Sequence, residues 1–199
     1  MPGVEELLET LSAETTKPKL HFAVATGTRT EHYTLKTSHL TKLFSYFPAN
    51  QIVLGDDERL KRVKPWPDIY LLALDKINEG IRRRKKEEGS TETEVTKDEC
   101  LVLEDALQGV ESARRAGMRV IWWPHKGLLE EYKGREKEVL AGLTGQLKEE
   151  EVVDSDVIED ELGLKEKPGE IDDGRAELLL SLEGFSFQRY GIDVGDRCP

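Results

Sequence analysis

The segment from Leu101 to Pro124, LVLEDALQGVESARRAGMRVIWWP, limits most strongly how this chain can fold. It opens with a short apolar run, Leu101 to Leu103, and closes with a second, Val120 to Trp123. Between them, apolar residues recur at three- and four-residue spacing, which predicts a helix, and Gly117 follows where glycine commonly ends one. Strand, helix and strand in this order predict a βαβ unit and an α/β fold with a parallel sheet.

An acidic pair, Glu104 and Asp105, directly follows the first of these strands. Ligands of open α/β sheets bind at the carboxyl ends of the strands. Two carboxylates at such a position are typical ligands of a hard cation. The dipole of the following helix would favour the same acids without any ligand, so both interpretations stand here.

Two more segments carry polar groups to predicted element ends. The run Leu20 to Thr26 predicts a strand that leads into Thr26 and Gly27, whose hydroxyl and N–H groups suit either an anion or a helix cap. Lys64 stands before two prolines in K-P-W-P-D-I-Y, which predict a rigid turn and a helix from Asp68 to about Gly80. A lysine held in this way either neutralises a phosphate or is an ordinary surface residue.

The apolar run Gln51 to Leu54 predicts another strand, followed by Asp56 and Asp57. These acids suit a metal ion, but acids in such loops are more often solvated, and we favour the structural interpretation. Apolar spacing also predicts helices over residues 4–11, 35–47 and 134–147.

The remaining chain predicts the domain organisation. The charged segment Arg82 to Asp98 has no apolar periodicity and reads as a solvated loop. We expect a core over residues 1–142, a flexible acidic linker over 143–176 and a C-terminal tail over 177–199. The apolar stretch Leu178 to Ile192 should pack back onto the core or onto a partner.

Composition excludes several classes of function. The net charge of -11 argues against a nucleic-acid partner, although it does not forbid a small phosphorylated substrate. The distant Cys100 and Cys198 form neither a disulfide framework nor a metal motif. No apolar run reaches membrane length and no signal peptide is recognisable, so we expect a cytoplasmic protein without a membrane partner, or a nuclear one if the basic run at 82–86 is a targeting patch.

Taken together, these motifs resemble those of the haloacid dehalogenase-like (HAD) phosphohydrolase superfamily. The family has a strand-end Thr or Ser, a K-P-x-P-D-x-Y/F segment and an E-D pair followed by small residues. The matching positions are Thr26, Lys64 to Tyr70, Glu104, Asp105, Gly109, Ala113, Ala116, Gly117 and Met118. The resemblance covers about residues 2–132 and is strongest to the pseudouridine-5′-phosphatase-like branch in its fungal type. It implies a cis peptide bond between Lys64 and Pro65.

The resemblance implies a Rossmannoid three-layer sandwich and Mg²⁺-dependent hydrolysis of small phosphorylated metabolites through an aspartyl-phosphate. Thr26 with the Gly27 amide would orient the phosphate and Lys64 would balance its charge, which makes Thr26 and Lys64 the catalytic candidates. Asp105 with Glu104 would hold the magnesium ion.

The chain also departs from the family. The D-x-D-G-T motif that carries the nucleophilic aspartate is absent, as are the helical cap and the central first strand. We therefore expect two groups of strands that face a gap, and a chain that is inactive alone. Three hypotheses remain: a C-terminal piece of a phosphatase that needs a complementing segment or partner chain, a non-catalytic phosphate-binding or interaction module, and a hydrolase with another nucleophile, such as Thr26 or Asp57.

Overall fold

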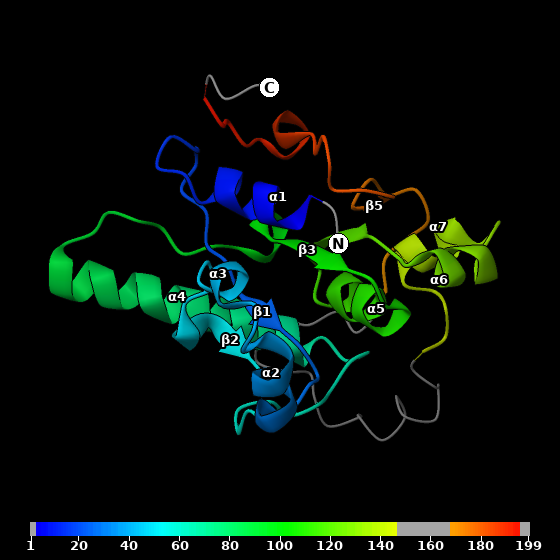
Figure 1. The fold of residues 1–199 in the computed structure, drawn as a ribbon, viewed down its shortest axis with the longest axis horizontal. Coiled ribbons are helices and arrows are strands. Elements are labelled where there is room, and N and C mark those ends of the chain that lie inside the picture. Colours follow the sequence, from blue (N-terminus) through cyan, green and yellow to red (C-terminus); the bar gives the residue numbers. More distant parts are fainter. Residues whose placement is uncertain (1–2, 147–167, 196–199) are drawn as a thin grey trace.

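The computed structural model describes residues 3–146 and 168–195, and Figure 1 shows its fold. Its centre is the parallel pair of strands β3 (Leu101–Glu104) and β4 (Arg119–Trp122), joined by helix α5 (Leu107–Arg115). This confirms the βαβ unit predicted from the sequence. Its elements form where apolar residues recur locally, and Gly117 follows the helix with a φ of 74°.

A third strand, β5 (Ala176–Leu178), pairs in parallel with the other edge of β4, which gives the order β3-β4-β5. Successive residues of a strand face opposite sides of the sheet. Val120 and Trp122 therefore pack on the side of α5, whereas Ile121 packs on the side of helix α1 (Val4–Leu11). Figure 1 shows α1 above this sheet and α5 below it, which confirms the predicted three-layer α/β architecture.

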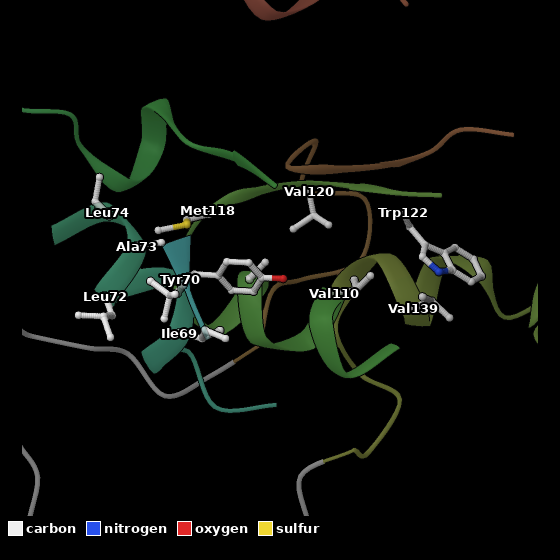
Figure 2. Packing of buried hydrophobic residues seen from close by; sticks show 13 residues of the cluster. Ile69, Tyr70, Leu72, Ala73, Leu74, Val110, Met118, Val120, Trp122 and Val139 are labelled. Atoms are coloured by element: carbon white, nitrogen blue, oxygen red, sulfur yellow. The ribbon is translucent and has the colours of Figure 1, made fainter. Parts of the chain in front are cut away.

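The larger of two hydrophobic clusters lies on the α5 side of the sheet, and Figure 2 shows its packing. Long helix α4 (Asp68–Glu88) supplies one wall of this cluster, and α5 and β4 supply the others. Its buried members are Val53, Ile69, Tyr70, Leu72, Ala73, Leu74, Val110, Ala113, Ala116, Met118, Val120, Trp122 and Val139.

Two further strands, β1 (Val24–Ala25) and β2 (Ile52–Val53), form a separate parallel sheet. Helix α4 contacts both of these strands and also α5, so it holds the two sheets side by side. In the part of the chain that the structure describes, β1 does not pair with β3. The central strand that the family resemblance places between them stays a prediction.

The helix predicted over 35–47 is wrong in its bounds, because two short helices, α2 (Thr30–Thr37) and α3 (Thr41–Phe44), occupy this region. The hydroxyl groups of Thr34 and Thr37 each donate to the carbonyl four residues earlier, a pattern that competes with regular helix continuation. The Leu40 N–H then bonds the Thr37 carbonyl at 2.8 Å and closes a turn between the helices.

The loop predicted over 82–98 is also wrong in its first part, since α4 continues to Glu88 and ends before Gly89, whose φ is 68°. Arginine, lysine and glutamate are good helix formers, and cations near a helix C-terminus interact favourably with its dipole. Ion pairs from Arg82 to Glu94 and from Arg84 to Glu92 then fold the following segment back along α4.

The C-terminal part of the described chain packs onto the core. Leu182 and Phe185 form the second hydrophobic cluster with Leu7 and Ile121, which confirms that the apolar stretch returns to the domain. Strand β5 crosses the predicted boundary between residues 176 and 177, and residues 147–167 of the predicted linker lie outside the described ranges.

The remaining elements are short. The helix predicted over 134–147 is reduced to its first part, and Gly142 follows it with a φ of 75°. No helix among the described residues is long and apolar enough to cross a bilayer. The remaining short helices are α6 (Lys126–Glu131) and α7 (Glu136–Ala141), and the 3-10 helices are η1 (Ala49–Gln51), η2 (Lys97–Glu99) and η3 (Phe187–Tyr190).

Candidate functional site

Strand β3 ends in Glu104, whose side chain is the centre of the candidate site. The side chain is only 9% exposed, and its Oε1 atom accepts hydrogen bonds from the Lys64 ammonium and from the Tyr70 hydroxyl. The Ala106 N–H approaches Oε2 at 3.5 Å. The structure thus joins two residues that lie 40 positions apart and that the sequence places at one sheet edge, Lys64 and Glu104.

The turn that carries Lys64 is fixed from both sides. The Lys64–Pro65 peptide bond is cis, as the family resemblance implies. The Arg62 guanidinium lies 4.0 Å from the centre of the Trp66 ring and also pairs with Asp68 at 3.0 Å. From α5, the fully buried Ser112 donates to the Trp66 carbonyl at 2.6 Å, so the turn is tied directly to the helix that follows the acidic pair.

Tyr70 approaches Glu104 from α4. Burial, followed by the negative charge of Glu104, raises the pKa of Tyr70 well above its usual value, so the hydroxyl remains a proton donor. The Lys64 ammonium also lies 4.9 Å from the centre of the Tyr70 ring. Figure 2 shows the Tyr70 ring among the residues of the larger cluster. We refer to Lys64, Tyr70 and Glu104 as the Glu104 cluster.

Gly109 on α5 leaves the space that the Glu104 carboxylate fills. A Cβ atom at this position would overlap the carboxyl group of Glu104. The requirement for glycine is therefore steric, because Gly109 lies inside a helix and has no positive φ.

Asp105, the second acid of the pair, is exposed at the same edge. Within the described residues it makes no hydrogen bond or ion pair, in contrast to Glu104. Its negative charge nevertheless contributes to the raised pKa of Tyr70, after burial and the effects of Glu104.

Thr26 and Gly27 follow β1 in the open turn that the sequence predicts. The Thr26 N–H bonds the Val53 carbonyl at 3.1 Å, and the Thr26 hydroxyl accepts from the Thr28 N–H at 3.2 Å, which leaves the hydroxyl proton available. A Cβ atom on Gly27 would meet nothing within 4 Å, so the turn faces open space. In the described parts of the chain, Thr26 has no hydrogen bond to Lys64 or Glu104.

The structure assigns structural roles to the other acids considered. Asp56 accepts from the Thr30 N–H at 3.0 Å, and this bond is the main cause of the lowered pKa of Asp56. Burial opposes the ionisation of Asp57, but hydrogen bonds from Lys76, at 2.6 Å, and from the Arg59 N–H outweigh it and lower the pKa of Asp57. Both carboxylates are occupied, which supports the structural interpretation of this pair.

The carboxylates at this sheet edge are the candidate donors for a metal ion. No group of three or more His, Cys, Asp or Glu side chains is arranged for a metal in residues 3–146 and 168–195. Magnesium in phosphate-processing sites is often held by one or two carboxylates together with substrate oxygens and water. Asp105, with Glu104 beside it, fits such a shared site but does not form a complete one.

Sequence reasoning missed two of these functional contacts. Ser112 gives no signal, because a helical serine is usually exposed, and its bond to Trp66 depends on tertiary packing. Tyr70 is part of the K-P-W-P-D-I-Y segment, yet the alternation of Tyr and Phe in that motif hides the role of its hydroxyl. The three-residue spacing of Gly109 and Ser112 on one face of α5 was the available indication.

These features define an α/β protein with a cluster of charged and polar side chains at the end of β3. The haloacid dehalogenase-like hydrolase family matches residues 1–117, more than half of the chain, and the chain therefore belongs to this family. Its relatives include a probable pseudouridine-5′-phosphatase of Saccharomyces cerevisiae, 37% identical over 194 residues, which are 96% of this chain and 61% of that protein. Similarity to this relative and to a Drosophila melanogaster counterpart places the chain in the pseudouridine-5′-phosphatase-like branch.

Two other comparisons agree. (DL)-glycerol-3-phosphatase 1, mitochondrial, of Arabidopsis thaliana is 36% identical over 143 residues, which cover 72% of this chain and 42% of that protein. The crystal structure of a HAD hydrolase from Entamoeba histolytica matches with a TM-score of 0.50 and 25% identity, over 77% of this chain and 59% of that one. The chain spans about half the length of the curated relatives it matches.

Proposed function

We propose that this chain carries the phosphate- and cation-binding part of a phosphatase site for small phosphomonoesters. The observation that supports this proposal is the Glu104 cluster, which fixes a lysine ammonium at the end of β3, where the exposed Asp105 directly follows Glu104 in the chain. The names of the pseudouridine-5′-phosphatase and glycerol-3-phosphatase relatives support a small phosphorylated metabolite as the substrate class.

Each residue has a distinct role in this proposal. The Thr26 hydroxyl and the Gly27 amide orient the phosphate, because the turn that carries them is open to the outside. Lys64 balances the charge of the phosphate oxygens. Asp105, beside Glu104, holds magnesium, which supplies positive charge against a transferring phosphoryl group when it is bound.

The covalent step needs a carboxylate that these residues do not supply. The 199-residue sequence contains no D-x-D-G-T segment, and the acids nearest to β2 are engaged by Thr30 and Lys76. We therefore propose that the chain binds phosphate in the presence of magnesium. By itself, the chain does not hydrolyse phosphomonoesters.

Replacing Asp105 with Asn is expected to weaken magnesium-dependent binding of inorganic phosphate by about 10–100-fold, the range seen when groups that support a bound metal are removed. Calorimetric titration of the full chain with phosphate in Mg²⁺ measures this effect. Glu87→Gln is the control, because Glu87 is an exposed acid on α4. Steady release of phosphate from phosphomonoesters by the wild-type chain, abolished in Asp105→Asn, would show that the inactivity proposal is wrong.

A second candidate function is suggested by the two separate sheets, in which β1 and β3 each have an edge without a strand partner among residues 3–146 and 168–195. An extended apolar segment from a partner or from elsewhere in the natural protein would pair with both edges by backbone hydrogen bonds. Such a segment would reach the same sheet edge as Thr26 and Glu104. In this case the chain acts as one half of a complemented assembly.

A peptide with an apolar strand followed by D-x-D-G-T is expected to bind and to slow amide hydrogen exchange in β1 and β3 by about ten-fold or more, because paired strand amides open less often. Exchange measured by mass spectrometry or NMR checks this prediction, with a scrambled peptide as the control. Equal exchange with both peptides would argue against complementation.

A further inference from the structure

The Tyr70 hydroxyl and the Lys64 ammonium share one oxygen atom of Glu104. Both groups donate to Oε1, and the ammonium lies 4.9 Å from the centre of the Tyr70 ring. The three side chains therefore form a closed arrangement in which moving one changes the distances of the other two.

Tyr70 is the most rigid member of this arrangement. As a whole residue Tyr70 is 6% exposed, and it belongs to the larger hydrophobic cluster. Lys64 is a longer side chain with more rotatable bonds and is 18% exposed. The ring thus provides the fixed reference, and Lys64 adopts the position that Glu104 allows.

Other contacts of the Glu104 carboxylate do not replace the hydroxyl. Among the residues that the structure describes, its Oε2 atom has only the Ala106 N–H at 3.5 Å, which is long for a hydrogen bond. Gly109 limits the space on the α5 side but donates nothing to the carboxylate in the described structure. Without the hydroxyl, the orientation of the carboxylate would depend mainly on Lys64 itself.

We propose that Tyr70 is a positioning residue: its hydroxyl fixes Glu104 and, through Glu104, sets the place of the Lys64 ammonium at the sheet edge. The phenol touches no substrate in this role. The part of the inference that concerns phosphate rests on the proposed function, whereas the part that concerns Lys64 does not.

Tyr70→Phe tests this role because the phenyl ring preserves the packing and removes only the hydroxyl. Tyr190→Phe is a matched control, since the buried Tyr190 hydroxyl has no hydrogen-bond partner in the described residues. In Tyr70→Phe, we expect the affinity for inorganic phosphate in Mg²⁺ to fall about ten-fold, as the loss of one hydrogen bond to a charged group predicts. Tyr190→Phe should bind phosphate like the wild type.

A second measurement makes the inference independent of phosphate binding. Under native conditions, acetic anhydride should acetylate Lys64 several-fold faster in Tyr70→Phe than in the wild type or in Tyr190→Phe, as mass spectrometry of the digested protein would show. Equal Lys64 acetylation in all three proteins would overturn the positioning role. Wild-type protein that binds no phosphate would instead overturn the proposed function, and the acetylation rates would still decide the role of Tyr70.

Discussion

Gly109→Ala is expected to destabilise the protein and to weaken phosphate binding, although alanine is the better helix former. The new Cβ atom would overlap the Glu104 carboxyl group and displace it. Lys64 and Tyr70 would then lose their shared acceptor in a largely buried place. Breaking a buried ion pair costs about 3–5 kcal/mol and the helix gains about 1 kcal/mol from alanine, so we expect a net loss of about 2–4 kcal/mol.

Gly80→Ala provides the matched control for this substitution. Gly80 also lies inside a helix, but its Cβ would meet the flexible end of Arg84 at 3.4 Å and the Gln51 side-chain amide nitrogen at 4.0 Å, without overlap. Here the free energy of unfolding should rise by about 0.5–1 kcal/mol. Urea unfolding of both variants measures the two changes. If both variants gain stability, the Glu104 side chain is free to move, and the inference that the Glu104 cluster is rigid is wrong.

The sequence allowed the βαβ unit to be predicted because its elements are determined by neighbouring residues. The apolar spacing of α5, the two apolar strands and Gly117 all lie within one short segment. Strand β5 could not be found in this way, because Ala176–Leu178 is paired only through contact with β4, over 50 residues away in the chain. The same limit explains why the sequence did not predict the C-terminal end of α4. The last turns of this helix depend on charge pairing with the segment that folds back along it.

The candidate site was predictable in its position but not in its internal contacts. Strand ends place Thr26 and Glu104 at the carboxyl edges of their sheets, and the proline-rich turn brings Lys64 there. The sequence treats Glu104 and Asp105 as equivalent metal ligands. The structure separates them, since Glu104 turns inward to Lys64 and Tyr70 while Asp105 remains exposed. This difference depends on tertiary packing, because the Tyr70 hydroxyl reaches Glu104 from α4.

Asp173→Asn is expected to lower the free energy of unfolding by about 3 kcal/mol, the lower end of the range for breaking a buried ion pair. Its partner, Arg114 on α5, has a side chain that is 2% exposed, whereas the Asp173 side chain retains 24% exposure. Without the carboxylate, the buried guanidinium would lack its counter-charge. The segment before β5 would then be held less firmly to α5, because Gly169 also packs directly against the Arg114 guanidinium.

The pH dependence gives a second test of the same ion pair. Burial opposes ionisation of Asp173, but hydrogen bonds from the Arg175 N–H and from Arg114 outweigh it and lower the pKa of Asp173 in the folded protein. The stabilisation is therefore complete above the unfolded-state pKa of about 3.9 and is lost as the pH falls further toward the folded-state pKa. Urea unfolding should show a wild-type advantage over Asp173→Asn at pH 7 that shrinks below about pH 4.

Asp172→Asn is the matched control for Asp173→Asn. The neighbouring Asp172 pairs with Lys137 at 2.6 Å, but these side chains are 63% and 67% exposed. Exposed pairs contribute about 0–1 kcal/mol, so this variant should unfold nearly like the wild type at every pH. A loss in Asp172→Asn as large as in Asp173→Asn would mean that the loop conformation, rather than the buried Arg114 charge, determines how the C-terminal segment is held. A wild-type advantage over Asp173→Asn that stays constant down to pH 2 would exclude ionisation of Asp173 as its source.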